Sequence, residues 1–417
     1  MTVEGAYNQL VAEGFVRSLP RRGFFDNDLP HAASLSLLKD GGYRDGGGAV
    51  ASMGEAASSP LTAVSLEGAR LWQRALKTVL ATQSEQELFA PAPAQGTLRL
   101  RRAIAPHLRG SRGMDVDPDA IVIGAGAQLL DTMLVQLLGR EGAYAVEDPG
   151  YLRLTRIYRA CGCDVRHIPL DSEGPNLAAL DTSGAAVLHL MPSHQFPTGL
   201  VASIARCCAL FGWASSKPGR YVIEDDFDCE FRLAGKPVPP LAAIDAPGCV
   251  LYTNTLSKSL SSALRLAYMV LPPQLLDRYR RDLSFYASTV GSVDQMVLAH
   301  LLETGEYECH VRRVRKRTRD ARDGLAEALL RSSLDGRTWL EGEDSGLHAV
   351  LVVRTDRDER ELVSLLGVPQ ESVSAFGEHV WSESNRVCDG ARRLIVQYLA
   401  LEVGMERELV ERPKAVL

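Results

Sequence analysis

Hydrophobic residues recur along this chain with two periods, one typical of helices and the other of buried strands. Apolar side chains over 61–80 and 98–108 repeat every three or four positions, which predicts two amphipathic helices. Short apolar runs predict buried strands at 120–124, 143–146, 165–169, 186–191, 250–252 and 266–271. Strands that alternate with helices in this way predict an α/β fold.

The parts outside this region differ in composition. Residues 29–60 are rich in Gly, Ser, Ala and Asp and cannot form a packed core, so we expect a flexible linker there. Two alternating runs at 347–353 and 393–401 predict a small α/β domain towards the C-terminus. The expected division is a large domain over 61–300 and a small domain over 301–417.

One lysine lies in an unusual setting between two apolar runs. Lys258 follows Thr255 and Ser257, precedes Ser259 and is followed by Arg265. Burial lowers the pKa of a lysine and frees a nucleophilic amine, which Schiff-base chemistry with an aldehyde requires. The hydroxyls and the arginine suit a phosphate. The stretch therefore indicates a site for pyridoxal 5'-phosphate (PLP), and a solvent-facing lysine in a Ser-rich loop is the alternative.

A pair of carboxylates lies upstream of this lysine. Asp225 and Asp226 follow the apolar residues of YVIEDD, which begins at Tyr221. A carboxylate at the end of a buried parallel strand lies at a functional sheet edge and can keep the pyridine nitrogen of PLP protonated. We expect Asp225, rather than Asp226, to take this role.

A glycine-bearing turn precedes the helix that is predicted to end at Leu138. Gly126, Ala127 and Gln128 open this helix, and free N–H groups at a helix N-terminus bind anions. We expect these three residues to hold the cofactor phosphate. A dinucleotide fingerprint is excluded, because its third glycine would fall at Leu129.

Composition and charge exclude several other classes of protein. The chain has 417 residues, of which 46% are hydrophobic, and it has no apolar run of the roughly 18 residues that a membrane span needs. Without a signal-peptide pattern, we expect a soluble, cytoplasmic protein without membrane partners.

The eight cysteines have no metal-ligand spacing, so we expect reduced thiols and no metal site. The net charge of -6 requires any nucleic-acid contact to use a local basic patch, and for the basic run over 309–322 we favour the solvated face of a long helix.

Four strings carry a resemblance to a known family. They are VEDPGY at 146–151, MPSHQFPTG at 191–199, VIEDDFD at 222–228 and TLSKSL at 255–260. Over about 96–271 the chain resembles the fold-type I PLP enzymes and, more closely, the aminotransferase-like domain of the MocR branch of GntR-type bacterial regulators. The PSHQFPTG string is the most specific, because ordinary aminotransferases have NPTG there. The resemblance implies a large domain built on a mixed sheet and a small C-terminal α/β domain. It also implies a homodimer whose active sites lie between the two domains and at the dimer interface.

The resemblance also implies roles for single residues. Tyr151 would stack face-on against the pyridine ring, and an ordinary half-buried tyrosine is the alternative. His194 or Gln195 would bond the ring oxygen of the cofactor, unless the histidine is simply satisfied in the core.

Three positions depart from the family pattern. Phe227 stands where transaminases usually have a tyrosine that bonds the cofactor's phenolic oxygen, and Pro91 replaces the tyrosine that reaches the partner's phosphate. Ile395 aligns near the arginine that binds the substrate α-carboxylate, and Arg393, on the same strand face, is the candidate substitute. We therefore expect cofactor binding to be kept and substrate turnover to be slowed.

The first 28 residues resemble part of a GntR-type winged helix. A helix over 2–13 would be the recognition helix, and two short strands over 15–25 would form the wing. The helices that normally precede them are lacking, so either the reading frame begins upstream of Met1 or the segment is a remnant. An N-terminal arm that packs on the enzyme domain is the alternative. DNA is therefore an expected partner only if a complete winged helix exists.

Two function classes remain open. The first is a PLP-binding transcriptional regulator whose aminotransferase-like domain senses an amino acid or the cofactor itself. The second is a freestanding PLP-dependent aminotransferase that acts on an amino acid. The winged-helix segment and the linker favour the regulator, whereas the lack of a full DNA-binding domain favours the enzyme.

Overall fold

The computed structural model describes the following residues: 11, 16–19, 23–26, 63–233, 239–245, 248–256, 258–332, 336–344, 346–369, 372–382, 390–401 and 409. It divides the chain into two compact units, Met1–Ser59 and Pro60–Leu417. In the first unit, β1 (Val16–Leu19) and β2 (Gly23–Asp26) form an antiparallel hairpin, which confirms the two predicted strands. The expected helix over 2–13 is described only at Val11, and the expected linker lies outside the described residues.

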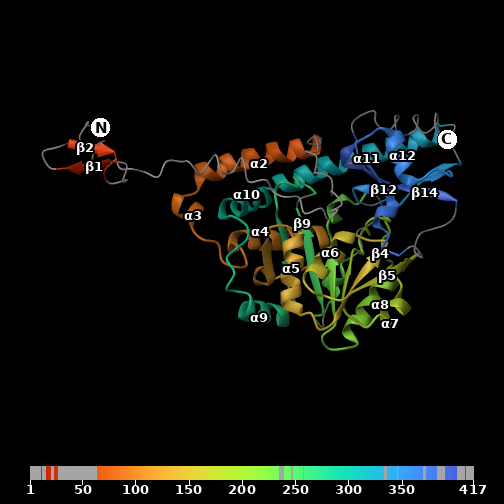
Figure 1. Cartoon of the computed structure of the whole chain (residues 1–417), viewed down its shortest axis with the longest axis horizontal. Coiled ribbons are helices and arrows are strands. Elements are labelled where there is room, and N and C mark those ends of the chain that lie inside the picture. The colour runs from red at the N-terminus through yellow and green to blue at the C-terminus, as the bar shows by residue number, and fades with distance from the viewer. Residues whose placement is uncertain are drawn as a thin grey trace. The chain divides into compact units, whose positions relative to one another are not determined.

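An eight-stranded mixed sheet forms the centre of the second unit (Figure 1), which confirms the α/β class. Its strand order is β3-β10-β9-β8-β7-β4-β5-β6. The strands are β3 (Ile121–Gly124), β4 (Ala143–Asp148), β5 (Val165–Asp171), β6 (Gly174–Pro175), β7 (Ala185–Leu190), β8 (Tyr221–Asp225), β9 (Val250–Thr255) and β10 (Ala267–Val270). Strands β9, β8, β7, β4 and β5 are parallel, whereas β10 is antiparallel to both of its neighbours.

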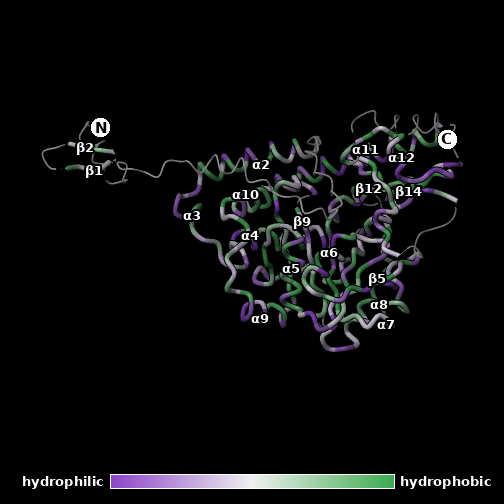
Figure 2. Tube along the Cα trace, viewed as in Figure 1, coloured by the Kyte–Doolittle hydropathy of each residue, from purple (hydrophilic) through white to green (hydrophobic). Residues whose placement is uncertain are grey.

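Helices cover both faces of this sheet. They are α2 (Ala63–Thr82), α3 (Glu85–Phe89), α4 (Leu98–Arg112), α5 (Ala127–Leu138), α6 (Leu152–Ala160), α7 (Leu177–Thr182), α8 (Ile204–Ser215), α9 (Pro273–Asp282), α10 (Ser292–Glu303) and α11 (Glu306–Leu330). Ile121 and Ile123 join a cluster with α2, α4 and α10, whereas Val122 joins a cluster with α5, α6 and α9. Successive side chains of a strand point to opposite faces, so β3 is apolar throughout because both of its faces are buried. Figure 2 shows hydrophobic residues along the central strands.

Helix boundaries follow capping signals in the sequence. The predicted helices over 61–80 and 98–108 correspond to α2 and α4. The Thr97 side chain accepts a hydrogen bond from the Leu100 amide and so caps α4. The helix continues to Arg112, beyond the predicted end, because Gly113 with φ 68° is the residue that ends it in the left-handed conformation.

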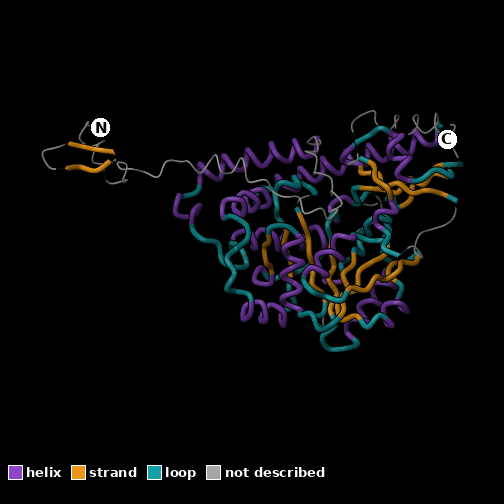
Figure 3. Tube along the Cα trace, viewed as in Figure 1, coloured by secondary structure: helices purple, strands orange, loops and turns teal. Residues whose placement is uncertain are grey.

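A second sheet of four strands follows along the chain, and Figure 3 shows the two sheets as separate groups of strands. Its strand order is β11-β12-β14-β13, from β11 (Thr338–Glu341), β12 (His348–Arg354), β13 (Val373–Ala375) and β14 (Ala391–Gln397), and α12 (Glu359–Leu366) lies in the same region. One face of this sheet packs against α11 and α12, and the other face holds Ile395 in a cluster with Val350 and Val352. This arrangement agrees with the predicted strands at 347–353 and 393–401. The division at residue 300 stays a prediction.

The basic run over 309–322 lies on α11 and contacts other parts of the unit. Arg315 donates to the Glu230 carbonyl oxygen at 2.7 Å and Arg319 donates to the Leu233 carbonyl oxygen at 3.1 Å. Arg317 forms an ion pair with Glu67 at 2.8 Å. These contacts give the arginines a structural role within the unit. None of the helices in the described ranges is both long and apolar enough to cross a bilayer.

Candidate cofactor site

The predicted site residues follow strands that end at one edge of the large sheet. Strands β4, β7, β8 and β9 are parallel, so their carboxyl ends lie together. Strand β3 ends at the same edge, because β3 and β9 are both antiparallel to β10. The residues after these ends include Gly126, Tyr151, Asp225 and Lys258. In open α/β sheets, ligands bind at this edge.

Lys258 lies in the turn that connects β9 to β10. Its side chain is exposed to solvent, yet protein surrounds it closely enough for desolvation to lower the pKa of its amine. Asp228 opposes this shift, Arg153 adds to it, and Asp225 also opposes it, so all three lie within electrostatic range of the amine. A lowered pKa leaves more of the amine neutral and nucleophilic. Ser257 lies outside the described residues.

The N-terminus of α5 is suited to an anion. Gly126 is its N-cap, with φ 89°, and no side chain caps the helix. The first amides of a helix have no acceptor within the helix, so those of Ala127 and Gln128 are directed outwards. A Cβ atom at Gly126 would lie 2.4 Å from Arg265 Nη2, which shows that the guanidinium packs directly on this turn. Thr255 belongs to the same edge, and its hydroxyl donates to the Leu266 carbonyl oxygen at 3.4 Å.

The two neighbouring aspartates point to different surroundings. Asp225 ends β8, and its carboxylate lies 3.7 Å from His189 Nε2. Asp226 is buried and forms an ion pair with Arg112 at 2.7 Å, while its Oδ2 accepts a hydrogen bond from the Tyr252 hydroxyl at 2.8 Å. The charge of Asp226 is therefore already engaged in the interior.

His189 forms a second layer behind Asp225. Burial alone would lower the pKa of His189, but Asp225, Asp131 and Glu147 together raise it. The Tyr158 hydroxyl bonds the other ring nitrogen of His189. His189 therefore lies between Asp225 and the buried residues Tyr158, Asp131 and Glu147.

Tyr151 stands at the start of α6 and is half-buried. Its ring meets Phe196 edge-on, with the centroids 6.1 Å apart, and Arg153 lies 5.7 Å from the ring centroid. Desolvation raises the pKa of Tyr151, and the charge of Arg153 and a hydrogen bond that the Gln128 side chain donates to the tyrosine oxygen oppose that shift. Tyr151 is thereby linked to the N-terminus of α5.

His194 is buried in a polar cluster at the end of β7. Its Nδ1 lies 2.8 Å from Asp228 Oδ2, and its ring centroid lies 4.3 Å from that of His348. The ligand-type atoms of these three residues all lie within 4.8 Å of one another. Asp228 Oδ2 also accepts from the Leu347 amide at 3.2 Å, so hydrogen bonds account for this cluster. His194 Nε2 is buried without a partner in the described structure.

Gln195 is bonded within its own turn. Its Nε2 donates to the carbonyl oxygens of Pro149 and Phe196, and its Oε1 accepts from the amide and hydroxyl of Thr198. Between the two candidates for the ring oxygen, His194 is therefore the one with an unused nitrogen.

The candidate substrate residues lie on β14. Arg393 Nε lies 3.5 Å from Glu341 Oε2, and the Arg393 amide donates to Glu359. Ile395 is fully buried in the apolar cluster that also contacts Phe196. An arginine that is engaged by Glu341 must leave that carboxylate before it binds another one.

Several residues of this region were not predicted from the sequence. His189 is a polar residue in an otherwise apolar strand, which is a detectable signal. Arg112 and His348 gave no signal, because their partners Asp226 and His194 lie far away in the chain.

The chemistry of this edge fits PLP. An uncapped helix N-terminus next to an arginine suits the phosphate, and the Asp225 carboxylate, with His189 behind it, suits a protonated pyridine nitrogen. A lysine with a lowered pKa suits the aldehyde. The turn at Gly126 leaves no room for a Cβ atom, as expected of a cradle shaped around the arginine and the ligand.

Comparisons with known proteins agree with this chemistry. Residues 60–366 match the family model of aminotransferase class I and II. The structure also resembles that of an archaeal alanine:glyoxylate aminotransferase, with a TM-score of 0.69 and 20% identity over 83% of this chain and 86% of that one. This likeness shows the fold.

Two curated relatives are regulators. The uncharacterized HTH-type transcriptional regulator YdeL of Bacillus subtilis (strain 168) is 35% identical over 87% of this chain and 78% of its own length. The probable rhizopine catabolism regulatory protein MocR of Rhizobium meliloti is 29% identical over 67% of this chain and 56% of its own length. The chain therefore belongs to the MocR-type branch of the GntR-family transcriptional regulators, and its aminotransferase class I and II domain takes PLP as its cofactor.

Proposed function

We propose that this chain is a regulator that holds PLP on Lys258 and senses an amino acid at the same site. The observation that supports this most strongly is the convergence of Lys258, Asp225 and the N-terminus of α5 on one sheet edge. When bound, PLP supplies an aldehyde for an amine and a pyridine ring that withdraws electrons.

We assign a separate part of PLP binding to each residue at this sheet edge. The amides of Ala127 and Gln128 bind the phosphate at the turn that Gly126 forms, together with Arg265 and with the side chains of Thr255 and Ser257. Asp225 keeps the pyridine nitrogen protonated, and His189 lies behind its carboxylate at 3.7 Å. Tyr151 lies against the ring, and His194 bonds the ring oxygen through its unpartnered Nε2.

Three features of the chain favour sensing over rapid turnover. Phe227 has no hydroxyl to hold the proton near the ring oxygen. Ile395 offers no charge to a ligand carboxylate, and Arg393 must first leave Glu341. A missing charge-assisted hydrogen bond costs about 1.5–3 kcal/mol, which corresponds to one to two decades in rate or affinity.

The partners follow from the family. The relatives are named as HTH-type regulators, so we propose DNA as the target, provided that a complete winged helix precedes the hairpin of β1 and β2. We also propose a homodimer that forms through the large domain, because the active sites of this fold are completed by a second subunit. A cytoplasmic location is consistent with a DNA target.

A freestanding aminotransferase is the second candidate, and a single-turnover experiment separates the two. Protein loaded with PLP is mixed with each common amino acid, and the visible spectrum is followed for conversion of the cofactor to its amine form. We expect a ligand-dependent spectral change with slow conversion, and faster conversion in Phe227→Tyr, which restores the phenol. Conversion by the natural chain at the roughly 1–10³ per second of ordinary enzymes would favour the aminotransferase.

A further inference from the structure

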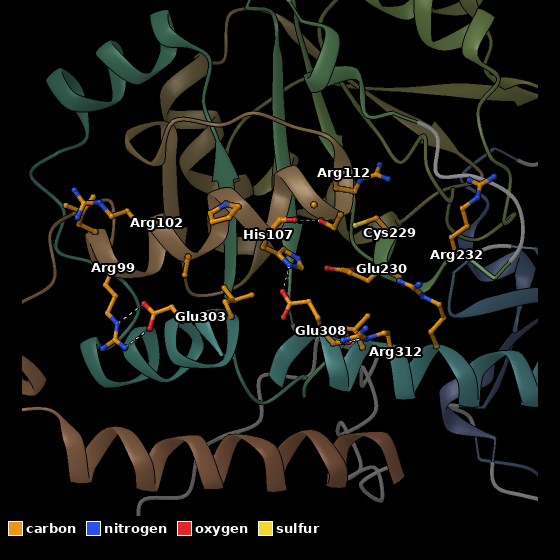
Figure 4. Close-up of a pocket in the computed structure, with 18 residues that line it drawn as sticks. Arg99, Arg102, His107, Arg112, Cys229, Glu230, Arg232, Glu303, Glu308 and Arg312 are labelled. Carbon is orange, nitrogen blue, oxygen red and sulfur yellow. Dashed lines mark hydrogen bonds and ion pairs between the residues drawn. The ribbon is translucent and has the colours of Figure 1, made fainter. Parts of the chain in front are cut away.

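The second unit contains a cavity whose lining does not include the residues of the cofactor edge. It has a volume of about 1160 Å³ and lies between α4, α10, α11 and the short helix η2 (Cys229–Phe231). Figure 4 shows the residues that line it. Lys258, Asp225, Tyr151 and Gly126 are not among them. The cavity is large enough for a small metabolite.

The lining carries an excess of positive charge. Its charged residues are Arg99, Arg102, Arg112, Arg232, Arg312, Arg315, Glu230, Glu303 and Glu308. Glu303 is paired with Arg99 at 2.7 Å, and Glu308 lies 2.9 Å from His107 Nδ1. The third glutamate, Glu230, is buried, and desolvation raises its pKa.

Three arginines of the lining form no ion pair with a carboxylate of the described residues, although Arg312 lies within electrostatic range of Glu308 and Arg102 within that of Asp119. Arg102 on α4 forms no ion pair among these residues, and Arg312 and Arg315 on α11 donate only to backbone carbonyls and to the Cys309 sulfur. An unpaired guanidinium binds carboxylates strongly, because it donates two parallel hydrogen bonds. The cavity therefore offers anion sites on two of its walls.

Arg102 on α4 and the arginines on α11 lie apart in the cavity, and other types of side chain line the space between them. Figure 4 places Arg102 towards one end and Arg312 towards the other, with His107 and Glu308 between them. Ala103 and Val311 add apolar lining. Glu308 Oε2 is buried without a hydrogen-bond partner among the described residues, so it requires a donor. Two acid groups at the ends and an ammonium group near Glu308 match an acidic amino acid.

Two chains of contacts connect this cavity to the cofactor edge. The Tyr307 ring packs edge-on against His107, and its hydroxyl lies 2.9 Å from Ser259 Oγ, next to Lys258. The same hydroxyl donates to Glu230 at 3.4 Å. On the other side, Arg112 lines the cavity and is paired with Asp226, next to Asp225. A ligand that moves Tyr307 or Arg112 therefore changes the surroundings of both cofactor-edge residues.

We propose that this cavity is an effector site for an acidic amino acid and that its occupancy alters the environment of Lys258. The binding part is independent of the proposed function, and the coupling part rests on it. Occupancy needs no reaction with PLP, because the lining residues are separate from Lys258. The site thus gives the regulator a second, non-covalent input.

The binding test uses glutamate and a protein whose cofactor has been fixed to Lys258 by borohydride, so that glutamate cannot react there. Calorimetry should show saturable binding, which weakens roughly tenfold or more in Arg312→Gln/Arg315→Gln. Arg313→Gln, an exposed residue of the same helix outside the lining, should bind normally. Glutarate, which lacks the ammonium, and glutamine, which lacks the second acid, should bind more weakly. No saturable binding at millimolar glutamate, or equal binding by the double variant, would overturn the proposal.

The coupling test follows the cofactor spectrum of the unreduced protein on addition of glutarate. Glutarate has no amine, so it cannot react with the aldehyde. We expect a spectral shift that is lost in Tyr307→Phe while glutarate binding is retained. An identical shift in Tyr307→Phe would refute the coupling through Tyr307. If the unreduced protein fails to take up PLP, the proposed function fails, and calorimetry on the cofactor-free protein still decides whether the cavity binds glutamate.

Discussion

The Asp226 carboxylate and the Arg112 guanidinium meet at 2.7 Å in the interior, where neither side chain is more than 3% exposed. The Tyr252 hydroxyl donates a further hydrogen bond to Asp226. Two charges that are removed from water in this way stabilise the fold only as a pair, because either one alone is costly to bury. Asp226 is therefore engaged within the fold, which supports the proposal that its neighbour Asp225 contacts the cofactor.

Asp225→Ala should mainly affect PLP binding, whereas Asp226→Ala should mainly affect the stability of the fold. Asp225→Ala should weaken PLP binding by about 2–4 kcal/mol, because a buried charge-assisted contact is lost, with a smaller effect on folding. Asp226→Ala leaves Arg112 buried and unpaired, so it should mainly lower the free energy of unfolding, by about 3–5 kcal/mol. A PLP titration and chemical denaturation of both variants measure the two effects. The reverse ranking in the titration would assign the pyridine contact to Asp226.

Gly126→Ala should weaken binding of the phosphate group. The new Cβ would lie 2.4 Å from the Arg265 guanidinium and would displace it from the N-terminus of α5. We expect PLP affinity to fall roughly tenfold or more, with a smaller loss for pyridoxal, which has no phosphate. Gly184→Ala is the matched control, because Gly184 also has a positive φ, 72°, but has open space around it. Equal losses for the two ligands would show that Gly126 does not act through the phosphate.

Glu224 should make the stability of the protein depend on pH. Desolvation raises the pKa of this buried carboxyl from 4.5 to about 8, although the Leu241 and Ala242 amides donate to it. Between these values the folded protein binds a proton that the unfolded chain releases. The free energy of unfolding should therefore fall as pH rises through this window, by at most about 1.4 kcal/mol per pH unit. Denaturation at pH 5 to 8 should show a shallower fall for Glu224→Gln, and parallel curves would contradict the shift.

The homodimer prediction is supported by exposed aromatic residues in the second unit. Phe285 is 74% exposed and stacks on Tyr286, in the segment whose Thr289 hydroxyl accepts from the Ala125 amide beside the N-terminus of α5. We expect this segment to contact the second subunit. Phe285→Asp should shift the protein towards monomer in sedimentation at micromolar concentration, whereas Ile204→Asp on α8, which is 66% exposed, should not. A natural chain that stays monomeric with PLP fully bound would exclude the dimer.

The sequence predicted the elements of the large sheet well, because strands that are buried on both faces are continuous apolar runs. Strands β3, β4, β5, β7, β9 and β10 all correspond to such runs. Strand β6 has only the residues Gly174 and Pro175, which carry no hydrophobic signal. The short outer strands β11 and β13 were also missed, because each has four residues or fewer and neither is a continuous apolar run.

The sequence predicted those site residues that belong to a local motif after a strand. Lys258, Asp225 and the turn at Gly126 each follow a strand, and parallel strands bring such residues together. The contact of Arg393 with Glu341 depends on the register between β14 and other strands, which no local pattern contains. The same holds for Arg112, whose partner is far away in the chain. Long-range pairs of this kind decide which of two adjacent carboxylates faces a ligand.

The central claim is that PLP is held on Lys258. Protein incubated with PLP should develop a visible absorbance band, and borohydride should then fix the cofactor to a single peptide that contains Lys258, as identified by mass spectrometry. Lys258→Ala should show neither the band nor the labelled peptide, while its fold is retained by circular dichroism. A Lys258→Ala variant that binds PLP in the same reducible form, with the label on another lysine, would contradict the assignment.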